Sequence, residues 1–368
     1  MEKERGKDVP RIEIIRMLKY TVSKKPAISI VLATFNSERF LEEQLESLAR
    51  QTRLPDELVV GDDGSTDRTP AILETFAGRA PFPVVIHRNA NRLGYTDNFL
   101  NLARLCKGEL IAFCDHDDVW KEQKLARCAI EFENPEVKLV AHDTAEVDEG
   151  LNLIGYDPGI RRSFAIRKNA DHPRLPWIAG CAEVLRREVV EEVFRRWPSD
   201  HAFRARSFGG KLLSHDQIVF FVANFVGEIR FIAEPLILHR FHGTNVTASR
   251  PTLERKVKFA ATVGSSSYRR QSLLFRAQAA IMREMAARGG DGYVTEGLTR
   301  KADVFMRIAV AARVRSRIYN ETSKLRRMLM IARAGRLGIY EARLGMHGFR
   351  SVAKDFAAAL LPRERWLD

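Results

Sequence analysis

The sequence has few cysteines and no long apolar run. Only four cysteines occur among the 368 residues, with no CxxC pair and no metal-site spacing: Cys106, Cys114, Cys128 and Cys181. We therefore expect reduced, buried thiols, which excludes a disulfide framework or a structural zinc site. No uncharged apolar stretch reaches the roughly 18 residues that a membrane-spanning helix needs. The composition is that of a protein with an ordinary hydrophobic core, since 45% of its residues are hydrophobic.

The first 26 residues have both signs of charge and lack the apolar segment of a secretory signal, so we expect a leader and a cytoplasmic protein. The net charge of +13 is unevenly distributed. Residues 252–368 hold 24 lysines and arginines against 10 aspartates and glutamates, whereas the remainder has 36 against 37. These counts predict a near-neutral domain at 27–250 and a basic helical region at 251–368.

Short apolar segments alternate with helical patterns through the first third of the chain. Strands are expected at 28–33, 57–61, 84–87 and 110–114, and helices at 37–48, 68–76 and 95–106. This alternation predicts an α/β fold with a mostly parallel, doubly wound sheet. In such a sheet the ligand site lies beyond the carboxyl ends of the strands.

Polar segments follow three of these expected strands. They are Thr34-Phe35-Asn36, Asp62-Asp63-Gly64-Ser65-Thr66-Asp67 and Asp115-His116-Asp117-Asp118. Carboxylates this close repel one another, which a divalent cation or sugar hydroxyls would relieve, and hard oxygen ligands favour Mg or Mn. The alternative for the last segment is a solvated acidic turn that caps the next helix.

These segments resemble those of family 2 glycosyltransferases with the GT-A fold, and within that family the rhamnosyltransferase-like bacterial enzymes of cell-surface polysaccharide assembly. Asn91-Arg92-Leu93-Gly94 before a helix and Val119-Trp120 after the aspartates belong to the same likeness. The likeness covers about 28–249 and is looser in its second half, at 177–182, 214–217 and 239–246. It implies a GT-A domain followed by a helical extension.

The resemblance also implies roles for individual residues. The donor nucleotide would be bound by Thr34, Phe35, Asn36, Asp62, Asp63, Arg92, Gly94, Asp115 and His242. The metal ion, Mg or Mn, would be held by Asp115 and Asp117, with Asp118 in support. The acceptor side would include Trp177, Gly180, Cys181 and His215.

Asp216 is the candidate general base. An acceptor hydroxyl needs a carboxylate to take its proton, and attack opposite the leaving group inverts C1. The alternative is that Asp216 only caps a helix at 217–225. His215 precedes it where many family members have glutamate, so Asp216 is a less direct match than Asp117.

The carboxyl-terminal third is dominated by helix formers, with long helices expected around 271–288 and 301–317. The second has an apolar stripe and arginines on other faces: Val304, Ile308, Ala311 and Ala312 against Arg307, Arg313, Arg315 and Arg317. Such a helix can lie on an anionic membrane surface, or it can pack within a helical domain. Nucleic acid is not an expected partner, because the arginines are not interleaved with aromatic residues.

The leading hypothesis is an inverting glycosyltransferase that moves a sugar from a UDP or dTDP donor to a saccharide or lipid-linked acceptor. A sugar-phosphate nucleotidyltransferase would need a glycine- and arginine-rich loop after the first strand, where this chain has residues 34–38 without either. A non-catalytic nucleotide-sugar-binding scaffold, recruited by its basic tail, is the second alternative.

Overall fold

The computed structural model describes residues 25–156, 164–166, 178–196, 214–243, 245, 265–287, 292–340, 352 and 355–356. The strands are β1 (Ile28–Thr34), β2 (Glu57–Asp62), β3 (Val84–Arg88), β4 (Leu110–Asp115), β5 (Val119–Trp120), β6 (Val137–Val147), β7 (Leu153–Tyr156), β8 (Phe164–Ile166), β9 (Glu183–Arg186) and β10 (Glu228–Arg240). The helices are α2 (Leu41–Ala49), α3 (Thr69–Ala77), α4 (Tyr95–Leu105), α5 (Lys124–Glu131), the short η1 (Gly180–Ala182), α6 (Arg187–Arg196), α8 (His215–Val226), α10 (Ser265–Ala287), α11 (Gly292–Asn320) and α12 (Lys324–Arg336).

The strands form one sheet in the order β3-β2-β1-β4-β9-β6-β10-β5, with β7 on β6 and β8 on β10. Strands β3, β2, β1 and β4 are parallel neighbours, and β10 runs parallel to β6. The strands β5, β7, β8 and β9 pair antiparallel to their neighbours. The sheet is therefore mostly parallel, as the alternation in the sequence predicts.

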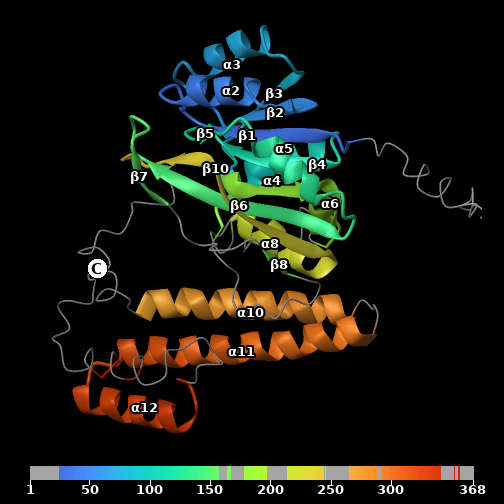
Figure 1. Cartoon of the computed structure of the whole chain (residues 1–368). Helices are drawn as coiled ribbons and strands as arrows, with labels where there is room; N and C mark the ends of the chain where they lie inside the picture. The colour runs from blue at the N-terminus through green and yellow to red at the C-terminus, as the bar shows by residue number, and fades with distance from the viewer. Residues whose placement is uncertain are drawn as a thin grey trace, which may run out of the picture.

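Helices cover both faces of the sheet, so the central strands are apolar on both sides (Figure 1). Along β1, Ile28, Ile30 and Leu32 belong to an apolar cluster that also holds core residues of α2, α3 and α5. Val31 and Ala33 belong to the opposite cluster, with core residues of α4, α6 and α8. The side chains of a strand alternate between faces, which is why one strand feeds both cores.

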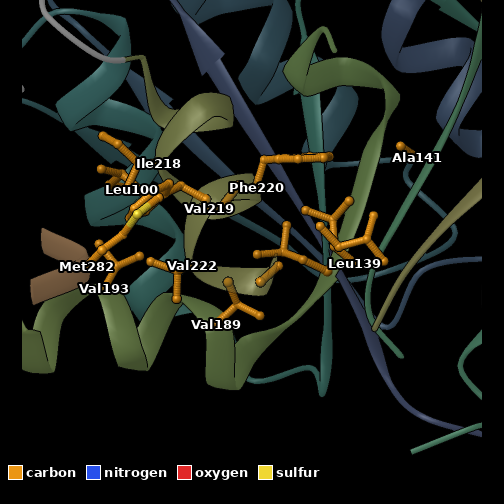
Figure 2. Close-up of a cluster of buried hydrophobic side chains, with 14 of the residues drawn as sticks. Leu100, Leu139, Ala141, Val189, Val193, Ile218, Val219, Phe220, Val222 and Met282 are labelled. Atoms are coloured by element: carbon orange, nitrogen blue, oxygen red, sulfur yellow. The ribbon is translucent and has the colours of Figure 1, made fainter. Parts of the chain in front are cut away.

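The carboxyl-terminal helices lie beyond α8, and α10 and α11 pack along one another (Figure 1). Phe275 of α10 meets Phe305 of α11 edge to face, with ring centroids 5.4 Å apart. Figure 2 shows Met282 of α10 in the same apolar cluster as Val193 of α6 and Val222 of α8. The helical extension thus shares a core with one face of the sheet domain.

Several helices differ from the expected boundaries or faces; α10 begins at Ser265 and α11 at Gly292, earlier than the expected 271 and 301. Helix α2 begins at Leu41, because residues 37–40 form a turn in which Ser37 O accepts the backbone N–H groups of Phe40 and Leu41. Helix α8 begins at His215, two residues earlier than expected, with Ser214 as its N-cap. In α11 the stripe around Ile308 is buried within the protein, so the packing alternative holds for that helix. Within the described residues, none of the helices combines the length and apolarity needed to cross a bilayer.

Gly61 provides a test of the close packing of α4 on β2. A Cβ at this position would lie 2.4 Å from Asn98 Oδ1 and 2.5 Å from Leu102 Cδ1. We expect Gly61→Ala to lower the free energy of unfolding by about 1 to 3 kcal/mol, because this overpacks a tight contact. The matched control is Gly78→Ala, whose Cβ would be at least 3.6 Å from its neighbours. Denaturant unfolding of both variants measures the difference, and equal stability would contradict the packing argument.

Candidate active site

The three polar segments meet at the carboxyl edge of the sheet, as the sequence predicts. Strands β1, β2 and β4 are neighbours, and the register pairs Thr34 with Asp62 and Ala33 with Asp115. Segments that are far apart in the sequence therefore end side by side. The structure brings the candidate donor residues into one place.

The first two segments are joined by hydrogen bonds between polar side chains and backbone. Thr34 Oγ1 donates to Asp62 Oδ1 at 3.3 Å, and Asp62 also accepts the hydroxyl of Ser65. Asn36 has a left-handed φ of 49°, which asparagine tolerates better than most residues. Its Oδ1 accepts the backbone N–H of Thr66 at 2.9 Å. These contacts fix the turn after β1 against the turn after β2.

Asp63 orders the segment that leads into α4. Its two carboxylate oxygens accept the backbone N–H groups of Leu93 and Gly94, each at 2.8 Å. Gly94 has a φ of 82°, so a glycine is favoured at this bend. The same segment places Arg92 over the ring of Phe35, with the guanidinium carbon 3.7 Å from the ring centroid. Asp63 thus has a positioning contact in addition to the nucleotide role predicted for it.

Asp115 has the least supported carboxylate of the three at the end of β4. None of the hydrogen bonds among the described residues reaches its carboxylate, and the side chain is only partly exposed. Burial, followed by the negative charges of Asp118 and Asp117, raises the pKa of Asp115 to about 8. The charge of Asp216 adds a smaller contribution in the same direction.

Asp117 is held by the segment that follows β10. His242 Nε2 lies 2.9 Å from Asp117 Oδ2, and Asn245 Nδ2 donates to the same oxygen at 3.3 Å. Burial alone would raise the pKa of Asp117. The hydrogen bond from His242 and the nearby charges of His116 and His239 outweigh burial and hold that pKa below its ordinary value. His242, for which the resemblance implied a donor-binding role, thus contacts Asp117 directly.

Asp118 is fully buried and is held by the end of β10. Its Oδ1 accepts from His239 Nδ1 at 3.0 Å and from the backbone N–H of Arg240 at 3.1 Å. Burial opposes a charge on His239, but the charge and hydrogen bond of Asp118 prevail and raise the pKa of His239 to about 9. The pair is thus an imidazolium–carboxylate ion pair at neutral pH.

The thiol of Cys181 lies next to this pair, 3.9 Å from His239 Nδ1. One ligand atom from each of Asp118, Cys181 and His239 falls within 4.8 Å of the others. A set with a thiol and an imidazole suits a softer ion than Mg or Mn. Burial and the neighbouring aspartates keep the pKa of Cys181 well above its ordinary value, so the sulfur stays a neutral thiol.

Arg240 is a site residue that the sequence analysis missed. The side chain is buried, its Nε donates to the backbone oxygen of Asp117 at 2.8 Å, and its guanidinium also contacts Glu43 and the backbone oxygen of Glu149. It lies 4.5 Å from the ring centroid of Phe40. A guanidinium with this many partners fixes the backbone of the aspartate loop. The signal in the sequence is its place in the segment 239–246, which follows the apolar run 236–238 and belongs to the family likeness.

Lys124 is a second buried cation near the site. Its Nζ donates to the backbone oxygen of Cys181 and lies 3.4 Å from the ring centroid of Trp120. Burial lowers the pKa of Lys124. The residue links the start of α5 to the short helix η1 and so holds the Gly180-Cys181 segment against the sheet.

Asp216 lies in the first turn of α8, and its Oδ1 accepts two hydrogen bonds there. Gln217 donates its backbone N–H to Oδ1 at 2.7 Å, and the Ser214 hydroxyl donates to the same oxygen. Among the residues that the structure describes, nothing donates a hydrogen bond to Asp216 Oδ2. Asp216 is therefore not the N-cap that the alternative expected, since Ser214 has that position; Oδ1 stabilises the first turn, and Oδ2 has no donor among the described residues.

His215 packs beside Asp216 as a neutral aromatic side chain. It stacks on Phe99 with ring centroids 4.1 Å apart and meets Phe113 edge to face at 4.9 Å. Neither ring nitrogen has a hydrogen-bond partner in the part of the chain that the structure describes, and burial lowers the pKa of His215 to about 4. A Cβ on Gly180 would lie 2.5 Å from His215 Nε2, so the glycine permits this packing.

Glu183 of β9 is a further buried group that the sequence analysis missed. Among the described residues, neither of its carboxylate oxygens has a hydrogen-bond partner. Burial and the charge of Asp216 raise the pKa of Glu183 well above its ordinary value, which favours the uncharged acid. Trp177, which was predicted for the acceptor side, lies outside the described residues.

Comparison with known proteins agrees with this geometry. Residues 29–194 match the model of glycosyl transferase family 2. Over 244 residues the chain is 29% identical to an uncharacterised glycosyltransferase of Nostoc, and the match covers 64% of this chain and 72% of that protein. It is 25% identical over 250 residues to the dTDP-rhamnosyl transferase RfbG of Shigella flexneri, and that match covers 65% of this chain and 81% of RfbG. An uncharacterised Mycobacterium tuberculosis protein is 26% identical, and the match spans 63% of its length.

Among solved structures, the chain is similar to residues 1–349 of S. aureus TarS in complex with UDP, with a TM-score of 0.51 and 16% identity over 90% of each chain. That likeness concerns the fold. Together with the family match over residues 29–194, it supports a GT-A-like α/β fold whose first part resembles glycosyl transferase family 2.

Replacing one aspartate at a time separates support of the loop from ligand binding. We expect Asp118→Asn to destabilise the protein by about 3 kcal/mol, because it leaves the buried His239 without its counter-ion. Asp117→Asn is the matched control, since it removes one of the crowded charges and leaves the His239–Asp118 pair intact. Thermal unfolding of the two variants gives the comparison. A larger loss for Asp117→Asn would mean that Asp118 does not have this supporting role.

Proposed function

We propose that this chain is an inverting glycosyltransferase of surface polysaccharide synthesis. It would transfer a sugar from a UDP or dTDP donor to a hydroxyl of a saccharide or lipid-linked saccharide. The main support is that three polar, aspartate-bearing segments meet at one edge of the sheet, in a chain whose residues 29–194 match glycosyl transferase family 2. The dTDP-rhamnosyl transferase among its relatives supports a deoxyhexose donor.

The donor nucleotide would lie over the ends of β1 and β2. Thr34, Asn36 and Asp62 are fixed to one another there, and Asp63 orients the backbone next to Gly94. The remaining acceptor capacity of Asp63 suits the N3–H of uracil or thymine. Arg92, stacked on Phe35, would add positive charge near the phosphates.

Asp115 and Asp117 fit a Mg or Mn ion, because they offer hard oxygen ligands. Asp115 fits best, since it has no hydrogen bond among the described residues, and burial, followed by the charges of Asp118 and Asp117, raises its pKa, which a cation would offset. Asp118 is turned to His239 and would support the loop without contacting the ion. When bound, the ion would neutralise charge on the diphosphate leaving group.

Asp216 would accept the proton of the acceptor hydroxyl through Oδ2. The acceptor oxygen would then form its bond to C1 as the bond from C1 to the diphosphate breaks, on the opposite face of the sugar. Oδ1 stays bound to Ser214 and Gln217, which keeps the carboxylate oriented. His215 and Glu183 are neutral, so neither competes as a charged partner.

Asp216→Asn tests the assignment of the base. We expect transfer to fall by a factor of about 10² to 10⁴, because the amide cannot accept the proton. Nucleotide binding should stay unchanged, since Asp216 lies on the acceptor side. Transfer from UDP- and dTDP-sugars to lipid-linked acceptors and calorimetric nucleotide binding are the two measurements.

The matched control for this variant is Ser214→Ala, which removes one capping contact and keeps the carboxylate. It should lose far less activity. If Asp216→Asn transfers sugar as well as the unchanged protein does, another group is the base. If the unchanged protein binds nucleotide but transfers from no donor, the scaffold hypothesis replaces the enzyme.

Calorimetric titration with UDP, dTDP and GDP, each with and without Mn, tests the donor site. We expect Mn-dependent binding of UDP or dTDP. The affinity should fall at least about tenfold in Asp115→Asn, because Asp115 has no hydrogen bond among the described residues and its carboxylate would serve as a ligand of the ion. Leu105→Ser, at an exposed position on α4, serves as the control. Nucleotide binding that does not depend on Mn, or that is equally strong in Asp115→Asn, would contradict the assignment of Asp115 as a metal ligand.

We further propose that the enzyme works at the inner face of the cytoplasmic membrane, where nucleotide sugars and lipid-linked acceptors meet. The basic region at 252–368, with 24 positive against 10 negative side chains, supports this location.

A further inference from the structure

We infer that α12 docks the protein on an anionic lipid bilayer through its exposed face. This inference deepens the proposed function and rests on it for the lipid-linked acceptor. It also assigns the contact to a different helix from the one whose apolar stripe the sequence emphasised, since α11 buries that stripe.

One side of α12 is anchored to the protein. Ser323 caps the helix by accepting the backbone N–H of Arg326 at 3.3 Å. Arg327 is buried and donates from Nε and a terminal nitrogen to the backbone oxygen of Glu321, at 3.1 and 2.9 Å. Ile331 and Ala334 are buried as well. Arg327, Ile331 and Ala334 recur at spacings of four and three, so they define the inward face.

The opposite side exposes large apolar side chains. Leu325 is 69% exposed, Leu329 is 62% exposed and Met328 is 36% exposed. With Ala332, these residues follow spacings of three and four and form one stripe directed away from the protein. Leu337, just after the helix, is also 69% exposed. An uninterrupted apolar stripe of this kind is unfavourable in water and marks a contact surface.

The charges beside the stripe have one sign. Lys324, Arg326, Arg333 and Arg336 are all exposed, and residues 322–340 contain no aspartate or glutamate. A helix with leucines on one side and only cations around them fits the boundary between anionic headgroups and acyl chains. The leucines would enter the acyl region while the arginines contact the phosphates.

The same charges disfavour a second copy of the chain as the occupant. In a two-fold contact between α12 helices, each stripe would bring its flanking Arg326, Arg333 and Arg336 towards the same residues of the other copy. Like charges without acidic partners repel, whereas an anionic surface neutralises all of them at once. The bilayer is therefore the occupant that the charges favour.

Vesicle co-sedimentation of the full chain tests this inference. The vesicles are phosphatidylcholine alone and phosphatidylcholine mixed with phosphatidylglycerol. We expect binding to the mixed vesicles only, weakened by high salt. The double variant Leu325→Ser/Leu329→Ser and the triple variant Arg326→Gln/Arg333→Gln/Arg336→Gln should each bind about tenfold or more weakly, because each removes one of the two contributions.

Leu105→Ser/Ile130→Ser is the matched control, since both residues are 52% exposed but lie on α4 and α5. It should bind vesicles like the unchanged protein. Nucleotide binding by calorimetry should be the same in all variants, so a failure of docking is distinguished from a failure of the transferase proposal. Unchanged vesicle binding by either α12 variant overturns the inference. If the unchanged protein sediments as a dimer and the α12 variants sediment as monomers that still bind vesicles, the inference is overturned in favour of a second copy.

Discussion

The site depends on keeping three carboxylates together at the end of β4. Each meets a different environment: Asp118 is paired with the charged His239, Asp117 is bound by His242, and Asp115 is left without a hydrogen bond among the described residues. The two histidines come from the end of β10 and the segment after it. The aspartates at the end of β4 are therefore held in this arrangement only when β10, the last strand in the sequence, is part of the sheet. The repulsion that remains at Asp115 is the feature that favours a cation there.

The fold, and the meeting of the polar segments at the carboxyl ends of β1, β2 and β4, could be predicted from the sequence, because both follow from local patterns. An apolar strand followed by polar residues identifies its own end, and parallel strands bring such ends together, as for Thr34 beside Asp62. The buried cations could not be found in this way. Arg240 is buried through partners such as Glu43, 197 positions away, and no local pattern records such a pairing. Glu183 was missed for the same reason, since its burial and its nearness to Asp216 arise from tertiary packing.

The two carboxyl-terminal helices show what an amphipathic pattern leaves open. Both α11 and α12 combine apolar residues with arginines, and the pattern alone does not tell whether the apolar face meets protein or another surface. In α11 the face around Ile308 meets α10, and Arg315 is buried against Asp355. In α12 the smaller residue Ala334 faces inward with Ile331, while Leu325 and Leu329 stay outside. Only the tertiary packing separates these cases.

Stabilising the first turn of α8 and accepting a proton are compatible at Asp216 because they use different oxygens. A base must be oriented, and it must not be neutralised by a permanent cation. Ser214 and Gln217 provide the orientation through Oδ1, and both are neutral donors. Burial disfavours a charge on two ionisable neighbours of Asp216, His215 and Glu183. Among the described residues no donor reaches Oδ2, which leaves this oxygen available to accept the proton of an acceptor hydroxyl.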